Sequence, residues 1–251
     1  MWRLPNSASR KEASVAPAAG FHQINDSQEN MRRLAQPQVL NRAVIAGLAT
    51  ALASYPRMAL WLNPSRPIWY LEAMIFLCSI VLWGFVFAWH ETYTQRPVWR
   101  FKLETKLFIV VTLIGITAAA VFHFFLDPPL RAQVPKEYPA DLENWLAQVL
   151  FSMFLTQLFL LFAPFAWLMR LFQNRRVAAI LTVLFGAFVW VIKNQSLPAP
   201  VHSGLFAALL AGRMVMGFLA VWFYLRGGIL LIWWWTILFE TRLLPDLAGH
   251  P

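Results

Sequence analysis

The sequence predicts an all-α, polytopic transmembrane helical bundle of about seven spans, and three observations support that prediction. Hydrophobic residues make up 59% of the 251 residues and charged residues only 13%, whereas soluble domains carry about 25% charged residues. The apolar residues form blocks that are long enough to cross the hydrocarbon core, which takes roughly 20 helical residues. Lys and Arg gather in alternate connections between these blocks, as they do in membrane proteins with a fixed orientation.

The apolar blocks define the expected spans. Four have the full length for a transmembrane helix: 68–89, 107–126, 145–167 and 203–225. Three are weaker because they are shorter or carry polar residues: 43–62, 177–192 and 229–244. We expect Gly227-Gly228 to make a tight turn between the last two spans, and Pro128-Pro129 to mark a semi-rigid loop after the third span.

The chain divides into a polar N-terminal segment and a membrane domain. Residues 1–42 are rich in Ser, Ala, Gln and Asn without a sustained apolar run, which predicts a cytosolic tail that is flexible or bound to a partner. This segment lacks the apolar core of a signal peptide. Its acidic residues Glu12, Asp26 and Glu29 argue against an organellar transit peptide. Residues 43–251 are the predicted transmembrane domain.

The basic residues predict the orientation of the bundle. Most of the 21 Lys and Arg fall in the N-terminal tail and in the second, fourth and sixth connections. The positive-inside rule then places the N-terminus in the cytoplasm and the C-terminus on the opposite side. The net charge of +9 is explained by contact with anionic lipid headgroups rather than with nucleic acid. We expect the bacterial inner membrane to be the location.

Cysteine and histidine do not form a recognisable metal or redox motif. Cys78 is the single cysteine, so the chain has neither an internal disulfide nor a cysteine metal cluster. His90-Glu91 would start a zinc-protease motif, but Thr94 stands where the second histidine belongs. His90 and His123 are expected near opposite membrane faces and therefore cannot share a metal. The sequence does not identify a cofactor, which stays unknown.

Two pairs of charged residues fall inside the predicted spans. Arg57 and Glu72 lie at similar depths on consecutive helices, so we expect them either to meet or to reach the headgroups separately. Arg213 and Glu240 both lie near the midplane, where a lone charge costs at least about 2.5–3.5 kcal/mol on insertion scales. We expect the second pair to line a polar cavity or to form a buried pair that fixes helix register.

The last third of the chain carries a recognisable order of motifs. Ala163-Pro164 precedes Arg170, an apolar helix contains Phe188, a small-residue helix covers 207–217, and the turn Tyr224-x-Arg-Gly-Gly-x-Leu follows. This order resembles the CPBP family of intramembrane proteases, which process CAAX-prenylated proteins and bacteriocins and are also called Abi proteins. The resemblance covers roughly residues 160–244.

The resemblance also implies that the catalytic chemistry is missing. The family motifs are Glu-Glu-x-x-x-Arg, Phe-x-x-x-His and His-x-x-x-Asn, and only Arg170 and Phe188 match them. Apolar residues replace the others: Phe165, Ala166, Ile192, Trp235 and Phe239. Activating water inside a membrane needs a general base and polar groups for the oxyanion, and these side chains supply neither. The implied protein is a protease-like scaffold without catalysis, a pseudoprotease.

Three functions are compatible with these features. The first is a non-catalytic CPBP-like membrane protein that binds a partner protein or a lipophilic ligand where the protease relatives bind substrate. The second is an accessory subunit of a larger membrane complex, in contact with lipids or pigments. The third is an active intramembrane protease that uses Glu91 or Glu240. The expected partners are membrane lipids and a membrane protein, and nucleic acid is not expected.

Overall fold

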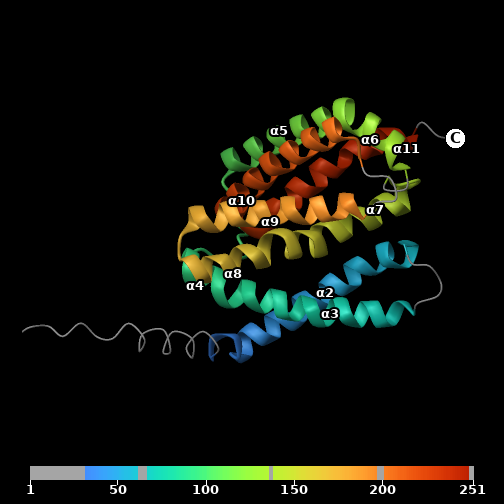
Figure 1. Ribbon diagram of the computed structural model, residues 1–251. Helices are drawn as coiled ribbons and strands as arrows, with labels where there is room; N and C mark the ends of the chain where they lie inside the picture. Colours follow the sequence, from blue (N-terminus) through green and yellow to red (C-terminus); the bar gives the residue numbers. More distant parts are fainter. Residues whose placement is uncertain (1–31, 62–66, 136–137, 197–200, 249–251) are drawn as a thin grey trace, which may run out of the picture.

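The structure is an all-α bundle of long apolar helices. The computed structural model describes residues 32–61, 67–135, 138–196 and 201–248, and every regular element in these ranges is helical. Six helical stretches in them are long and apolar enough to cross a membrane. Figure 1 shows these helices lying side by side along one common direction. The predicted fold class, a multi-pass transmembrane bundle, is therefore confirmed.

The helices follow one another with short connections, and several continue through a π-helical turn. The first two are α2 (Pro37–Trp61) and α3 (Ile68–Phe85), which passes through η1 (Val86–His90) into α4 (Glu91–Thr94). Next, α5 (Thr105–Val121) passes through η2 (Phe122–Leu126) into α6 (Asp127–Gln133). Then α7 (Leu142–Phe151) passes through η4 (Ser152–Thr156) and η5 (Leu158–Phe162) into α8 (Ala163–Phe172). The chain ends with α9 (Arg175–Gln195), α10 (Ser203–Glu240), η6 (Thr241–Leu243) and α11 (Leu244–Ala248).

Helix α10 is a hairpin of two antiparallel legs, 203–227 and 229–240. Gly228 interrupts it with φ 69° and ψ −162°. A straight helix would separate Gly212 from Phe239 by about 40 Å at 1.5 Å per residue. Both nevertheless lie beside Phe122, whose ring centroid is 4.9 Å from that of Phe239. The described helices therefore cross the bundle seven times, because α10 supplies two of the crossings. The predicted turn at Gly227-Gly228 is confirmed.

The loop at 95–104 stabilises the turn of this hairpin. A Cβ atom at Gly228 would lie 2.6 Å from the carbonyl oxygen of Val98, so only glycine fits this position. Breaking the helix leaves backbone carbonyls without helical partners. Arg96 donates to the carbonyl of Leu225, and the Ile229 N–H donates to Val98 O at 3.2 Å. The loop thus supplies the hydrogen bonds that the turn has lost.

The two ends of the bundle differ in charge. We call one the basic end, which carries Arg96, Arg100, Arg175, Arg176 and Arg226, and the other the acidic end, which carries Asp127, Asp141 and Asp246. Figure 1 shows α2 beginning at the basic end and α11 lying at the acidic end. The start of α2 and helix α11 therefore lie at opposite ends. Which end faces the cytoplasm stays a prediction.

Two boundaries differ from the sequence predictions. Helix α2 begins at Pro37, six residues before the predicted span, because proline fits the first turn of a helix, where its missing N–H is not needed. Pro128-Pro129 were expected in a loop, but they occupy the first turn of α6 for the same reason. Most of the predicted tail, residues 1–31, lies outside the described residues.

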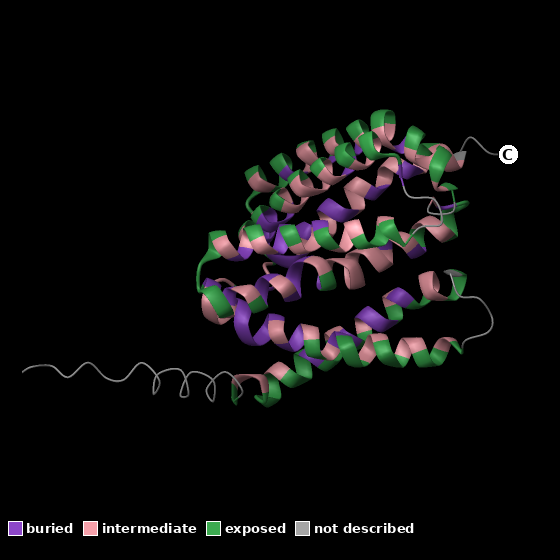
Figure 2. Ribbon diagram, in the orientation of Figure 1, coloured by how far each residue is buried: buried purple, intermediate pink, exposed green. Residues whose placement is uncertain are grey.

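Aromatic side chains fill the half of the bundle next to the basic end. We define the aromatic cluster as Trp83, Phe87, Phe162, Phe165 and Tyr224, whose side chains are almost completely buried. Their rings pack closely: Trp83 and Phe87 are stacked with centroids 5.4 Å apart, and Phe162 and Tyr224 are tilted with centroids 4.9 Å apart. Figure 2 shows the buried positions along the inner faces of the helices and the exposed ones along their outward faces.

Three consecutive tryptophans hold the second leg of α10 in place. Trp233 donates to the Met153 carbonyl at 2.9 Å, and Trp234 donates to the Thr112 hydroxyl at 2.9 Å. Trp235 packs against the first leg. Tryptophan is suited to this role because it combines a large apolar ring with one N–H donor that needs a partner when buried. The second leg is therefore anchored on three sides.

Candidate functional site

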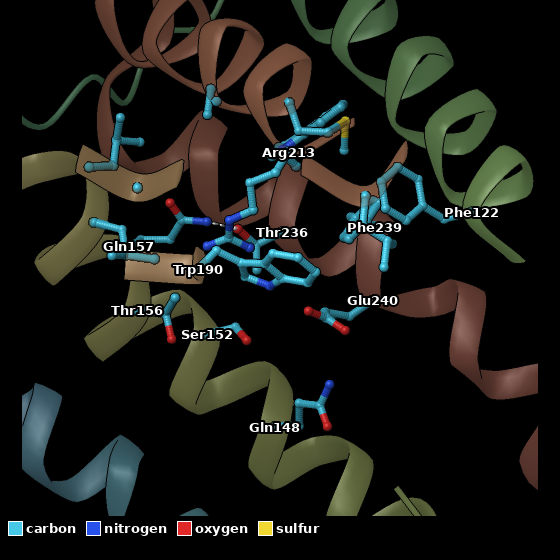
Figure 3. Close-up of a pocket in the computed structure, with 18 of the residues that line it drawn as sticks. Phe122, Gln148, Ser152, Thr156, Gln157, Trp190, Arg213, Thr236, Phe239 and Glu240 are labelled. Atoms are coloured by element: carbon cyan, nitrogen blue, oxygen red, sulfur yellow. Dashed lines mark hydrogen bonds between the residues drawn. The ribbon is translucent and has the colours of Figure 1, made fainter. Parts of the chain in front are cut away.

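A cavity of about 420 Å³ lies inside the half of the bundle next to the acidic end. Its walls are α7 with η4, α9 and both legs of α10, and Figure 3 shows their side chains converging on it. The volume falls within the roughly 300–1,000 Å³ of small-molecule sites. Leu161 and Val221 line it next to the aromatic cluster, while Tyr138 and Lys193 line it near the acidic end.

Polar side chains of α7 and η4 form one wall of the cavity. Gln148, Ser152 and Thr156 are spaced by four residues and therefore share a helix face. The π-helical turn of η4 widens the helix, and Gln157 lines the cavity beside Thr156. Gln157 donates a 3.1 Å hydrogen bond to the hydroxyl of Thr236, which lies on the second leg of α10. The side-chain oxygen of Gln148 is buried without a hydrogen-bond partner.

Arg213, on the first leg of α10, faces this polar wall. Figure 3 shows its guanidinium reaching into the cavity towards Gln157 and Thr236. Arg213 is half-buried and forms neither a hydrogen bond nor an ion pair with the residues that the structure describes. A charge at this depth is costly unless water or a counter-charge compensates it. The cavity therefore contains a cationic group that has no hydrogen-bonded counter-charge among the described residues, and Glu240 acts on it only at a distance.

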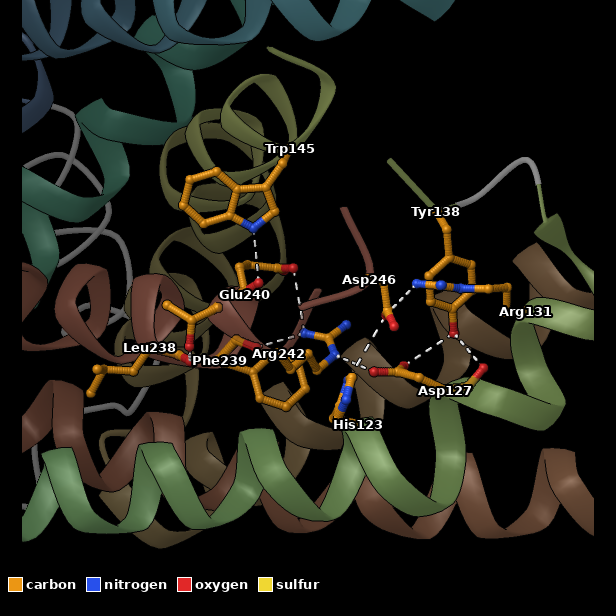
Figure 4. Close-up of polar contacts among 11 residues, drawn as sticks. His123, Asp127, Arg131, Tyr138, Trp145, Leu238, Phe239, Glu240, Arg242 and Asp246 are labelled. Atoms are coloured by element: carbon orange, nitrogen blue, oxygen red, sulfur yellow. Dashed lines mark hydrogen bonds and ion pairs between the residues drawn. The ribbon is translucent and has the colours of Figure 1, made fainter. Parts of the chain in front are cut away.

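A network of charged residues lines the cavity near the acidic end, and Figure 4 shows the contacts among them. Arg242 lies 3.1 Å from Asp127 and 3.4 Å from Glu240, so one guanidinium contacts both carboxylates. Tyr138 donates to Asp127 at 3.0 Å. Burial, together with the negative charge of Asp127, raises the pKa of Tyr138, which keeps its hydroxyl protonated as a donor. Trp145 holds the backbone of Glu240 through a 2.9 Å hydrogen bond.

The predicted pairs of charged residues are placed differently from each other. Arg213 and Glu240 line the same cavity and interact electrostatically, but the ion pair of Glu240 is with Arg242. Arg57 also lines the cavity. Glu72 has a buried carboxylate oxygen without a hydrogen-bond partner, and the described residues show no ion pair between it and Arg57.

The first motif of the resemblance lies away from the cavity. Phe165 and Ala166 are completely buried in the half next to the basic end. Arg170 lies over the ring of Trp89, with its guanidinium carbon 4.4 Å from the ring centroid. These three positions therefore contribute to packing at the basic end.

The other motif positions divide between the surface and the cavity. Phe188 and Ile192 lie on the outward face of α9, with 61% and 49% of their surface exposed. Trp235 and Phe239 line the cavity. The described structure thus brings two of the seven motif positions to the cavity and leaves the others elsewhere.

The histidines and Glu91 have structural surroundings. His90 is buried with its ring centroid 4.6 Å from that of Tyr224, whereas His123 lies 3.9 Å from Asp246 near the acidic end. Their predicted separation is confirmed. Among the described residues, no group of three or more His, Cys, Asp or Glu is placed to hold a metal. Glu91 accepts a hydrogen bond from Val98 N at 3.1 Å and so stabilises the 95–104 loop.

Several cavity residues were not identified from the sequence. Arg242 and Asp127 fall beside predicted span ends, where charges are ordinary, so nothing in the sequence indicates that they meet. The polar wall has a recognisable signal, because Gln148, Ser152 and Thr156 recur every fourth residue within an apolar span.

Comparison of this chain with protein-family models, with curated proteins and with solved structures found no match. The resemblance to the CPBP family therefore stays a prediction from the sequence motifs. The functional argument depends on the cavity and on the charges around it.

Proposed function

We propose that this protein is a non-catalytic integral membrane protein that binds a small lipophilic ligand in the cavity. The observation that carries the proposal is the cavity itself, because it combines an apolar lining with a few polar groups, as binding sites for small molecules do. The sequence motifs resemble those of the CPBP proteases without their catalytic residues, and ligand binding is a function that a protein of this kind retains.

A binding site fits these surroundings better than a pore. The cavity occupies one half of the bundle, and the aromatic cluster fills the other half with almost completely buried rings. Close packing of this kind leaves no continuous polar path for an ion or a solute. A ligand entering from the acidic end would therefore stop beside Leu161 and Val221.

The carboxylates near the cavity are already engaged in ion pairs. Glu240 and Asp127 both contact Arg242, which holds them in place rather than leaving them to contact a substrate. Glu91 is used to cap the loop at the basic end, away from the cavity. This arrangement supports binding over proteolysis.

A pair of glycine substitutions tests the proposal. A Cβ added at Gly186, on the cavity wall, meets nothing within 4 Å, and the same is true at Gly204 outside the cavity. Gly186→Leu should therefore fill the cavity without disturbing the helix, and Gly204→Leu is the matched control. Both proteins would be purified in mild detergent, and their bound small molecules identified by mass spectrometry after extraction.

We expect one class of amphiphile to co-purify with the wild-type protein and with Gly204→Leu, and to be depleted in Gly186→Leu. Equal amounts in all three proteins would show that nothing specific occupies the cavity. That result would contradict the proposal, provided that both variants elute as the wild type does in size-exclusion chromatography.

We further propose that the protein resides in the bacterial inner membrane with its basic end in the cytoplasm, supported by the positive residues at that end. Reporter fusions at Gln36 and at the C-terminus should report the cytoplasmic and the opposite side, respectively. Reports of the same side from both fusions would contradict the orientation.

A further inference from the structure

Among the described residues that line the cavity, both carboxylates already have a cationic partner. Asp127 and Glu240 contact the guanidinium of Arg242. Arg213 lines the same cavity without an ion pair to either carboxylate. A cation at this depth is costly unless water or a counter-charge compensates it. Arg213 therefore favours an anionic ligand.

Arg213 is the cationic group best placed to contact that ligand. It projects into the cavity from the first leg of α10 and has no hydrogen-bond or ion-pair partner among the described residues. The opposite wall carries further uncommitted donors, because Ser152 and Thr156 make no side-chain hydrogen bond with the described residues. An anion between these walls would receive donors from both sides.

We propose that Arg213 binds the anionic head group, a carboxylate or a phosphate, of a single-chain amphiphile. This inference rests on the proposed binding function and gives the chemical class of the ligand. Guanidinium groups bind carboxylates and phosphates through two parallel hydrogen bonds, and such charge-assisted contacts are the strong ones. A neutral ligand would leave the guanidinium of Arg213 without a directly bound counter-charge inside the membrane.

The size and lining of the cavity define the rest of the ligand. A volume of 420 Å³ corresponds to about 14 water molecules at about 30 Å³ each. That space fits a ligand of about a dozen non-hydrogen atoms and is too small for a two-chain lipid. Apolar side chains beside the polar wall, including Phe151, Leu160 and Met216, would contact the alkyl chain.

Four probes with the same ten-carbon chain test the head-group preference: decanoate, decyl phosphate, decanol and decyltrimethylammonium. Their binding to the full-length protein in phosphatidylcholine nanodiscs would be measured by competition against radiolabelled decanoate. We expect decanoate and decyl phosphate to bind at least about tenfold more tightly than decanol, and decyltrimethylammonium to bind most weakly. Acetate and inorganic phosphate test whether a free anion without a chain is sufficient.

Substitutions then assign the preference to Arg213. Arg213→Gln should weaken decanoate binding at least about tenfold and leave decanol binding within threefold, while Arg213→Lys should retain the preference for anions. Arg226→Gln is the matched control, because Arg226 lies on the same leg outside the cavity and is exposed. It should bind as the wild type does.

The outcomes separate this inference from the proposed function. If Gly186→Leu abolishes decanoate binding while Arg213→Gln leaves it unchanged, the cavity binds ligand but Arg213 does not recognise the anion. If the wild type binds none of the probes, both proposals fail. If inorganic phosphate competes as strongly as decyl phosphate, the cavity is a simple anion site. That result would overturn the inference that the ligand is an amphiphile. Should Arg213→Gln not fold, equal affinity of the wild type for decanoate and decanol would still reject the inference.

Discussion

The half of the bundle next to the basic end and the half next to the acidic end use their side chains in opposite ways. At the basic end, the aromatic cluster fills the interior and arginines hydrogen-bond to backbone carbonyls around the Gly228 turn. At the acidic end, the same helices enclose a cavity with charged and polar walls. One helical bundle thus contains a close-packed half and a hollow half.

This difference indicates how stability and binding are divided within the fold. Packing of buried rings stabilises helix association in a membrane through van der Waals contacts. An open polar cavity contributes little packing and keeps charged groups accessible. We therefore expect substitutions near the basic end to change stability and substitutions near the acidic end to change binding, apart from the Arg242 network.

The largest effect is expected from Phe165→Ala in the aromatic cluster. Phe165 is completely buried, and truncation of a buried phenylalanine costs about 3–5 kcal/mol because it leaves a cavity. The thermal midpoint measured by tryptophan fluorescence should fall strongly. Phe188→Ala removes the same group from an exposed position and should change the midpoint little. Equal losses in the two variants would show that the half next to the basic end is not the packed core.

Arg242→Met should have the next largest effect, of about 3 kcal/mol, because it leaves two partly buried carboxylates without their cation. The control is Arg131→Met. Arg131 pairs with Asp246 at 2.5 Å, but both side chains are about one third exposed, and exposed pairs contribute at most about 1 kcal/mol. Chemical denaturation of the two variants side by side would compare them. A larger loss in Arg131→Met would contradict the central position of Arg242.

Gly228→Ala should cost about 1–3 kcal/mol from backbone strain alone, because only glycine readily adopts φ 69° with ψ −162°. The added Cβ also meets the Val98 carbonyl, which is backbone and cannot easily move. The folded yield after membrane extraction should fall. Gly204→Ala, in open surroundings, should give the wild-type yield, and a wild-type yield from Gly228→Ala would argue against the hairpin turn.

The smallest effect on stability is expected from Tyr224→Phe, which is also the one variant of these four that should raise it. The hydroxyl of Tyr224 is buried without a hydrogen-bond partner, and an unsatisfied buried polar group costs about 1–3 kcal/mol. Its removal should leave ring packing intact and raise the thermal midpoint slightly. A lower midpoint would show that the hydroxyl has a partner, such as a buried water.

The spans could be predicted from the sequence, but the site could be predicted only in part. Runs of apolar residues are a local property, so the membrane helices and the Gly227-Gly228 turn were found correctly. The sequence predicts a semi-rigid loop at Pro128-Pro129. The structure places both prolines in the first turn of α6, because proline needs no N–H partner there. Arg213 and Glu240 were identified because charge is rare in apolar spans.

The sequence by itself determined that the chain is a multi-pass helical membrane protein, because helix length and hydrophobicity are set residue by residue against the thickness of the bilayer. Only the tertiary structure decided which charges meet. Glu240 was expected to pair with Arg213, but its ion pair is with Arg242, two residues further along the chain. Arg242 also contacts Asp127, which is 115 residues away in the chain. Such contacts depend on helix rotation and packing, which the order of residues along one helix does not specify.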